Sequence, residues 1–228
     1  IVDYLENDWT DGENSLELPV QVTEPEGSAE DLAYVKDLLG SFTTSFSTSG
    51  ADRSKNVNSG AKHVNGTVLY PGETFSMYET VAPFTAENGY AMAGSYLNGE
   101  VVDSMGGGIC QVSTTLYNAV LRAELEVVER SPHSMTVHYV ELSEDAAIAG
   151  TYKDFKFKNS TDYPIYIEGY TTSDKKITFN IYGKETRDSN RSISFESVLV
   201  NEVKPNTILR DDAGQGLGYK SVSAGKTG

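Results

Sequence analysis

Cysteine is almost absent from this chain of 228 residues, since Cys110 is the only one in it. A single cysteine excludes an internal disulfide, and one cysteine with three histidines supplies too few ligands for a zinc finger. We therefore expect neither a metal nor any other cofactor. Most free cysteines are buried and behave as small apolar residues, so the location of Cys110 must decide whether it does chemistry.

Basic clusters and long apolar runs are also missing. The chain carries 18 Lys and Arg against 33 Asp and Glu, and without a cluster of cations a nucleic acid is a poor partner. No run of 18 apolar residues occurs, so no membrane span is predicted. The chain opens at Ile1 without Met and stops at Gly228 in mid-pattern, and we interpret both ends as those of a fragment.

Three helices are predicted in the first half of the chain. Ser28 is a suitable N-cap for a helix that ends at Gly40, and residues 52–64 alternate in a helical manner before Asn65-Gly66. The clearest helix follows three glycines, because apolar residues then recur at helical spacing: Ile109, Val112, Leu116, Ala119, Val120 and Ala123.

The second half of the chain indicates strands. The runs are rich in Val, Ile, Tyr, Phe and Thr and are separated by turn residues; they cover residues 127–140, 152–158, 163–170, 176–182 and 193–203. Helices followed by an antiparallel meander predict an α+β fold, with N-terminal helices and the Cys-bearing helix packed on the sheet.

Cys110 lies in the first turn of the clearest helix, directly after Gly106-Gly107-Gly108. The partial positive charge at a helix N-terminus favours a thiolate. Glycines also leave backbone N–H groups accessible, so Gly107 and Gly108 are candidates for holding an oxyanion, with Gln111 beside them. The alternative is a tight turn into a buried helix, and we favour the nucleophile.

A cysteine nucleophile needs a base, and spacing selects His133 over His63 and His138. The helix advances roughly 21 Å from Cys110. A strand that starts at Val127 and runs back at about 3.3 Å per residue returns to the cysteine near His133. His138 would overshoot by about 16 Å and would face the other way. The alternative for His133 is a core histidine bonded to a carbonyl.

Other candidates complete the expected site. Asp145 is the first choice to orient the imidazole, with Glu141 and Asp103 behind it. Arg130 either binds a substrate carboxylate through its fork or is a surface charge. Two further residues are assigned to substrate binding: Ser113 and Glu73, the second in a compact polar loop, residues 73–76, that we expect to form a wall of the groove.

The segment Gly106-Gly-Gly-Ile-Cys-Gln-Val-Ser-Thr-Thr-Leu-Tyr-Asn118 resembles the central motif of the VanW family. Other marks of that family occur in order around it: Asn65-Gly66, Pro71-Gly-Glu-Thr-Phe-Ser76, Gly89-Tyr90, Glu129-Arg130, His133-Ser134, Tyr139, Asp145-Ala146, Asp154, Phe157-Lys-Asn159 and Pro164-Ile165. One departure is that Ser143-Glu144 stands where a glycine usually precedes the Asp-Ala pair.

The resemblance implies a division of the chain and an activity. Residues 42–185 correspond to the VanW-like domain, residues 1–41 to a linker from a preceding peptidoglycan-binding-like module, and residues 186–228 to a β-rich extension that resembles the start of a G5-type module. Some members of the family resemble L,D-transpeptidases, which make 3–3 crosslinks in peptidoglycan through a cysteine thioester. An extracytoplasmic location follows, in the cell wall or on the outer face of the membrane.

Two other functions remain open. A cysteine L,D-carboxypeptidase or amidase would use the same site, with water as acceptor in the first case. A non-catalytic wall-binding scaffold would keep Cys110 as a packed residue. An exposed thiolate pairs between chains in oxidising surroundings, so for an enzyme we expect a recessed site in a monomer, with peptidoglycan stem peptides as partners.

Overall fold

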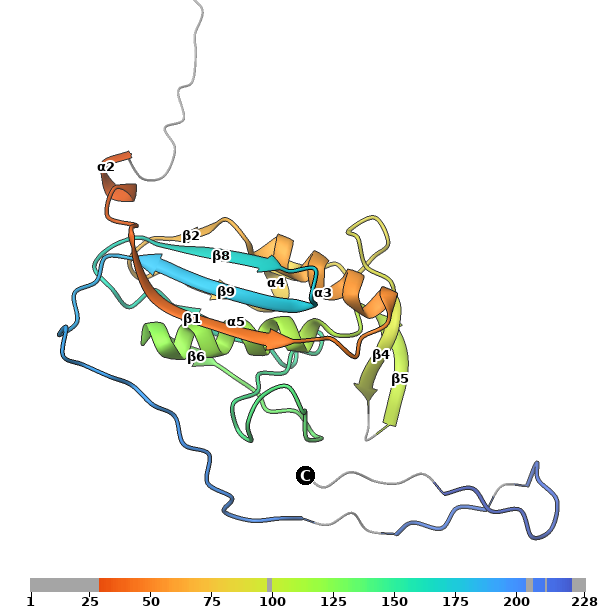
Figure 1. Cartoon of the computed structure of the whole chain (residues 1–228). Helices are drawn as coiled ribbons and strands as arrows, with labels where there is room; N and C mark the ends of the chain where they lie inside the picture. The colour runs from red at the N-terminus through yellow and green to blue at the C-terminus, as the bar shows by residue number, and fades with distance from the viewer. Residues whose placement is uncertain (1–28, 98–99, 204–206, 212, 223–228) are drawn as a thin grey trace, which may run out of the picture.

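The computed structural model describes residues 29–97, 100–203, 207–211 and 213–222 (Figure 1). Its main sheet is antiparallel and has the order β1-β9-β8-β2. The β8–β9 hairpin, which comes late in the chain, thus lies between β1 and β2, which come early. The bounds are β1 Asp37–Ser45, β2 Thr67–Leu69, β8 Ile165–Thr171 and β9 Lys176–Gly183.

Two smaller sheets complete the β structure. One has the order β3-β7-β6, and the other is a two-stranded hairpin that projects beside the main sheet (Figure 1). The bounds are β3 Thr74–Ser76, β4 Met92–Leu97, β5 Glu100–Met105, β6 Glu126–Glu129 and β7 Lys156–Lys158.

Helices cover the main sheet and enclose the core with it. The described helices are α2 Ala29–Leu32, α3 Ala51–Val64, α4 Met77–Val81 and α5 Ile109–Ala123. Helix α5 packs on β1 and β9, and α3 packs on β8. Val112, Leu116 and Val120 of α5 are fully buried, in agreement with the helical spacing of its apolar residues. Among the described residues, no helix has the length and apolar character needed to cross a bilayer.

Both ends of the sheet domain lie together. Asp37, the first residue of β1, pairs with Gly183, the last residue of β9. Arg187, just beyond β9, donates to the carbonyl oxygens of Leu39 and Arg122 at 2.9 and 3.1 Å. The chain before β1 and the chain after β9 therefore leave from the same end of the sheet (Figure 1).

The predicted α+β class is confirmed, but the helix expected to end at Gly40 is wrong. Only residues 29–32 of it are helical, and residues 37–45 form β1. Ser28, its expected N-cap, and residues 1–27 lie outside the described residues. A Cβ on Gly40 would lie 2.4 Å from the carbonyl oxygen of Ala119 and from the amide nitrogen of Ala123. This glycine therefore allows β1 to approach α5 closely and does not end a helix.

Helices 52–64 and 109–123 are confirmed, and the hairpin 163–182 is confirmed within a few residues. The strand expected over 127–140 is wrong beyond Glu129, because the chain leaves the sheet as an irregular loop that reaches to residue 155. Pro132 in that loop lacks the N–H group that a ladder requires. The strand expected over 193–203 is also wrong, since residues 184–203 contain no helix or strand.

The division of the chain into modules stays a prediction. The expected boundary between residues 41 and 42 falls inside β1, whose residues 40–45 pair with β9 without interruption.

Candidate active site

Cys110 is the second residue of α5 and is half-buried at a cavity of about 1500 Å³. Gly108 is the N-cap of this helix, and its φ of 106° is left-handed and favours glycine. The thiol of Cys110 donates to the carbonyl oxygen of Ile148 at 3.4 Å. The nucleophile candidate therefore faces the loop between β6 and β7, which carries His133.

The glycine turn before Cys110 is pinned from two sides. The side-chain amide of Asn56, on α3, donates to the carbonyl oxygen of Gly107 at 2.9 Å. On the other side, a Cβ on Gly107 would lie only 2.2 Å from the carbonyl oxygen of Ala93, at the β4–β5 hairpin. Glycine is required at 107 by this close approach, and Asn56 fixes the orientation of its peptide.

Some backbone N–H groups of the glycine turn bond to nearby carbonyl oxygens, and others do not. The N–H groups of Gly107, Ile109 and Gln111 donate to carbonyl oxygens of Ser104, Gly106 and Gly108 respectively. In the described part of the chain, Gly108 and Cys110 are left as the residues of this turn whose N–H groups have no backbone acceptor. These two N–H groups are therefore the ones that would bond to an oxyanion at Cys110. The N–H group of Gly107, which was expected to do so, is bonded to Ser104.

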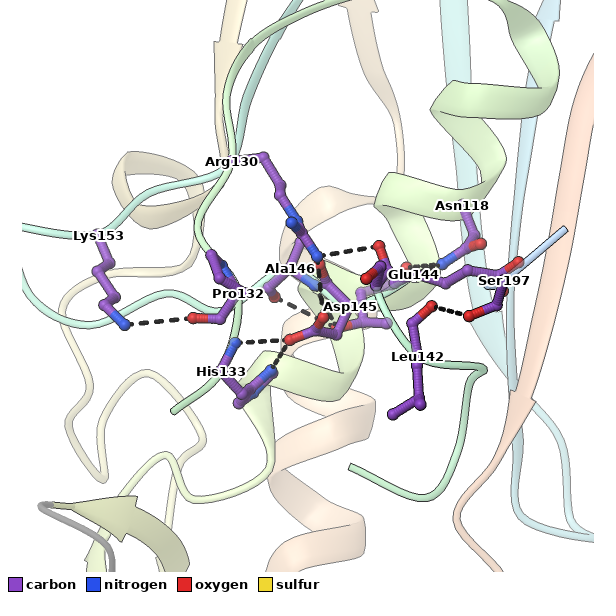
Figure 2. Close-up of polar contacts among 12 residues, drawn as sticks. Asn118, Arg130, Pro132, His133, Leu142, Glu144, Asp145, Ala146, Lys153 and Ser197 are labelled. Atoms are coloured by element: carbon purple, nitrogen blue, oxygen red, sulfur yellow. Dashed lines mark hydrogen bonds and ion pairs between the residues drawn. The ribbon is translucent and has the colours of Figure 1, made fainter. Parts of the chain in front are cut away.

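His133 and Asp145 form a tight pair (Figure 2), and His133 lines the same cavity as Cys110. One oxygen of Asp145, Oδ2, accepts from the backbone N–H and from Nδ1 of His133, both at 2.6 Å. Burial by itself lowers the pKa of His133, whose side chain is only 8% exposed. Hydrogen bonds to Asp145 and to Cys110 outweigh that effect and raise the pKa from 6.5 to about 9.

Arg130 holds Asp145 from the far side (Figure 2). Its NH2 group donates to Oδ1 of Asp145 at 2.9 Å, and its Nε donates to the backbone oxygen of Asp145 at 2.6 Å. Burial raises the pKa of Asp145, but the bonds from His133 and the charge of Arg130 lower it, so the carboxylate is the stable form. Arg130 is therefore occupied in orienting Asp145 and does not line the cavity, in contrast to the substrate role considered for it.

The loop that presents His133 is fastened to α5. Thr114 donates to the carbonyl oxygen of Ala146 at 3.2 Å and accepts from its N–H at 3.0 Å, and Asn118 donates to the carbonyl oxygen of Glu144 at 2.7 Å. Ser143 adopts a left-handed φ of 69°. This is the conformation that glycine adopts most easily, so Ser143 takes the backbone conformation expected of the glycine that the resemblance placed before Asp145.

Residues 133–140 are not a strand, so the expected alternation of faces does not apply to the histidines. Met135 and Val137 are buried, and the exposed His138 lines the same cavity as His133. His63 lies on α3, where its Nδ1 is 2.7 Å from the carbonyl oxygen of Ser59 and its ring stacks on Tyr90. The structure thus brings Cys110, His133 and Asp145 together; their catalytic roles remain predictions.

Several expected site residues lie elsewhere. Ser113 is fully buried in α5, and its hydroxyl has no hydrogen-bond partner among the residues that the structure describes. Glu73 is exposed, accepts from the N–H of Tyr70 at 2.6 Å and does not line the cavity. The walls come instead from residues 45–53, the β4–β5 hairpin and residues 133–153. Asp103 lines the cavity, whereas Glu141 does not, and neither is bonded to His133.

The side chain of Gln111 connects β1 to Arg53 and does not act as a free donor in the cavity. Its side-chain amide donates to the hydroxyl of Thr44 at 3.0 Å and to the carbonyl oxygen of Ser45 at 2.9 Å, so both of its hydrogens are used. Its oxygen accepts from Arg53, a cavity residue that sequence reasoning missed. Arg53 belongs to a polar helix far from Cys110 in sequence, and only the packing of α3 beside the glycine turn reveals its place.

Comparison with known proteins gives one family and two relatives. The family profile described as "VanW like protein" matches residues 52–182. The uncharacterised protein YoaR of Bacillus subtilis is 39% identical over 157 residues, which are 68% of this chain and 52% of that protein. The Vancomycin B-type resistance protein VanW of Enterococcus faecalis is 31% identical over 134 residues, which are 56% of this chain and 48% of that protein.

The chain thus spans about half the length of the curated relatives it matches. No solved structure gives a significant match to it.

Proposed function

Because the chain belongs to the VanW-like family, we propose that it acts on bacterial peptidoglycan as a cysteine-dependent L,D-transpeptidase that forms 3–3 crosslinks. The observation that carries the proposal is the line Cys110–His133–Asp145–Arg130, whose first two members line one cavity. A nucleophile, a proton carrier and an orienting carboxylate are the parts that acyl transfer requires. The name of the Enterococcus relative, a vancomycin resistance protein, is consistent with a role at the cell wall.

The first step is acylation. The Cys110 thiolate attacks the carbonyl of the residue at position three of a stem tetrapeptide, at the L-centre of its diamino acid. The N–H groups of Gly108 and Cys110 hold the oxyanion. His133, which is protonated at neutral pH because its pKa is about 9, gives its proton to the departing amine. The terminal D-alanine leaves, and a thioester and a neutral His133 remain.

The second step resolves the thioester. The side-chain amine of a second stem attacks the thioester carbonyl, and neutral His133 takes the proton from that amine. The Cys110 thiolate leaves, so the enzyme returns to its starting form with a new amide bond. Asp145 keeps Nδ1 of His133 bonded throughout, which leaves the other ring nitrogen for the transfers. Water in place of the amine would make the same site a carboxypeptidase.

The proposed substrate places the site outside the cytoplasm, where peptidoglycan stems are crosslinked. The cavity of about 1500 Å³, lined by residues 45–53, Cys110 and residues 147–149 among others, has a volume sufficient for a stem peptide.

The test is incubation of the purified chain with disaccharide tetrapeptide, followed by mass spectrometry of crosslinked dimers and released D-alanine. Cys110→Ala is expected to reduce product by at least about a thousandfold, and His133→Gln by about a hundredfold or more. His63→Gln is the matched control, since His63 bonds to Ser59 on α3 and does not line the cavity.

Retained activity in the Cys110→Ala variant would rule out the nucleophile. Binding of stem peptides by the parent protein without any product, even on long incubation, would favour the non-catalytic scaffold. D-alanine release without dimers would favour the carboxypeptidase.

A further inference from the structure

The chain makes a tight turn between Ala149 and Lys153, both of which line the cavity that holds Cys110. The N–H group of Ala149 donates to the carbonyl oxygen of Lys153 at 2.9 Å, and that of Lys153 donates back to Ala149 at 3.3 Å. Ile148, the residue directly before the turn, accepts from the thiol of Cys110 at 3.4 Å. The turn therefore begins next to the residue that the nucleophile contacts.

The side chain of Lys153 reaches from this turn to the part of the loop that carries His133 (Figure 2). Its ammonium donates to the carbonyl oxygen of Pro132 at 3.2 Å, and Pro132 directly precedes His133. Lys153 is thus tied at both ends to the site. Its backbone is bonded to the residue after Ile148, and its ammonium lies one peptide unit from the proposed acid and base.

Lys153 brings a positive charge to the cavity wall. In the part of the chain that the structure describes, Pro132 is the hydrogen-bond partner of its ammonium, and no carboxylate pairs with it. A carbonyl oxygen carries no net charge, and an ammonium has three donors, so two N–H groups remain for a ligand. The chain has 33 acidic against 18 basic residues. A half-buried cation at the cavity of such a chain favours an anionic ligand there.

Tyr152 adds an apolar surface beside this cation. Its side chain is 72% exposed although it is large, and it lines the same cavity. Gly150, whose φ of 52° is left-handed, lets the chain turn tightly enough for a Cβ there to lie 3.6 Å from the ring of Tyr152. An exposed tyrosine offers a large contact area with few rotatable bonds, which suits the binding of a peptide.

We propose that the turn Ala149–Lys153 recognises the stem peptide, with Lys153 binding one of its carboxylates and Tyr152 packing on the adjoining peptide chain. This inference rests on the proposed function. A stem tetrapeptide carries one carboxylate on its last residue and another on an internal acidic residue. An ammonium on a flexible stem binds either of them as a point charge.

The consequence is a specificity for anionic stems. Amidation of the recognised carboxylate removes the anion and leaves Lys153 without its ionic partner. A wall whose stems are amidated at that position would therefore be a poor substrate, although the scissile bond is unchanged.

Binding is measured by calorimetry in the Cys110→Ala background, so that turnover plays no part. The ligands are disaccharide tetrapeptide with both carboxylates free, the same compound amidated at its C-terminus, and the same compound amidated at the internal acidic residue. We expect one of the two amidations to weaken binding at least about tenfold, because it removes a charge-assisted contact. The amidation that does so identifies the bound carboxylate.

Variants assign the effect to the turn. Lys153→Gln should abolish the preference for the acid, and Lys153→Arg, which keeps the charge, should retain it. Lys62→Gln is the matched control, because Lys62 is exposed on α3 and does not line the cavity. Tyr152→Ala should weaken the acid and the amide alike, by about threefold to tenfold. Lys153→Met, which keeps an unbranched stem, replaces the glutamine variant if that variant does not fold.

Three results would overturn the proposal: no loss of affinity on either amidation, a preference for the acid that survives the loss of the Lys153 charge, and no binding of any of the ligands. The fate of the proposed reaction is read separately. A preference that depends on Lys153, in a protein that forms neither dimers nor free D-alanine, would refute the transpeptidase and leave the recognition site standing.

Discussion

His133 is the residue whose protonation governs the site. Its pKa of about 9 means that it holds a proton at neutral pH. It therefore enters the proposed cycle as an acid, and becomes a base only after the first amine has left. Asp145 and Arg130 enforce this order, because a carboxylate fixed by a guanidinium stabilises the imidazolium.

The protonation of His133 can be measured directly. In an NMR titration of the histidine ring protons, we expect the His133 midpoint to lie near 9. Asp145→Asn removes the anion that raises it, so the midpoint should fall toward the ordinary 6.5. Glu141→Gln is the charge-matched control, because Glu141 is exposed and was the second candidate for the orienting carboxylate. Equal shifts in the two variants would contradict the assignment of Asp145.

Sequence alone could identify Cys110 because its signal is local, a glycine turn followed by a helix. His133 was located by length arithmetic that required only a return toward the cysteine. The return is made by a loop and not by a strand, so the residue was found although its conformation was not. Arg53 and Asn56 gave no signal, because their roles depend on how α3 packs beside the glycine turn.

At the scale of elements, β1 shows how a correct observation can predict the wrong structure. Gly40 ends an apolar pattern, which is typical of a helix stop. Its actual role is to let β1 cross α5, where the backbone atoms of Ala119 and Ala123 leave no room for a side chain. Whether Gly40 ends a helix or allows close packing depends on residues about 80 positions away along the chain. Rules for helix ends consider only nearby residues, so they could not predict this contact.

Substitution of Gly40 tests this contact between elements. Gly40→Ala places a methyl group 2.4 Å from two backbone atoms of α5, and overpacking of this kind costs about 1 to 3 kcal/mol of unfolding free energy. Gly216→Ala is the control, because nothing lies within 4 Å of its added Cβ and it lies outside the helices and strands, and its effect should stay within about 0.5 kcal/mol. Urea unfolding measures both, and equal effects would contradict the close approach.

For the molecule as a whole, the raised pKa of His133 makes stability depend on pH. A raised pKa contributes stability that is complete below the ordinary 6.5 and is lost as pH rises through about 9. The lowered pKa of Asp145 has the opposite sense: its contribution is present above the ordinary 3.8 and is lost as pH falls through its lower folded value. Both contributions are complete between these two ordinary values.

Unfolding in urea at pH 6.5 and pH 9.5 tests this dependence. We expect the free energy of unfolding to fall by about 1 to 3 kcal/mol over that interval because of His133. The glutamine of the His133→Gln variant does not titrate between pH 6.5 and pH 9.5. The unfolding free energy of this variant should therefore fall by about 1 to 3 kcal/mol less than that of the parent protein. A variant whose stability follows the same course as that of the parent protein would show that His133 does not carry the effect.

The pairing of Asp37 with Gly183 has a mechanical consequence. Both flanking segments leave at the end of the sheet where α5 finishes, whereas Cys110 lies at the start of that helix, roughly 21 Å away at 1.5 Å per residue. Tension between the two segments would open the β1–β9 pair one hydrogen bond at a time from that end. The force would not pass through the glycine turn. A tether attached at the Asp37–Gly183 end of the sheet would therefore hold the domain and leave Cys110 unstrained.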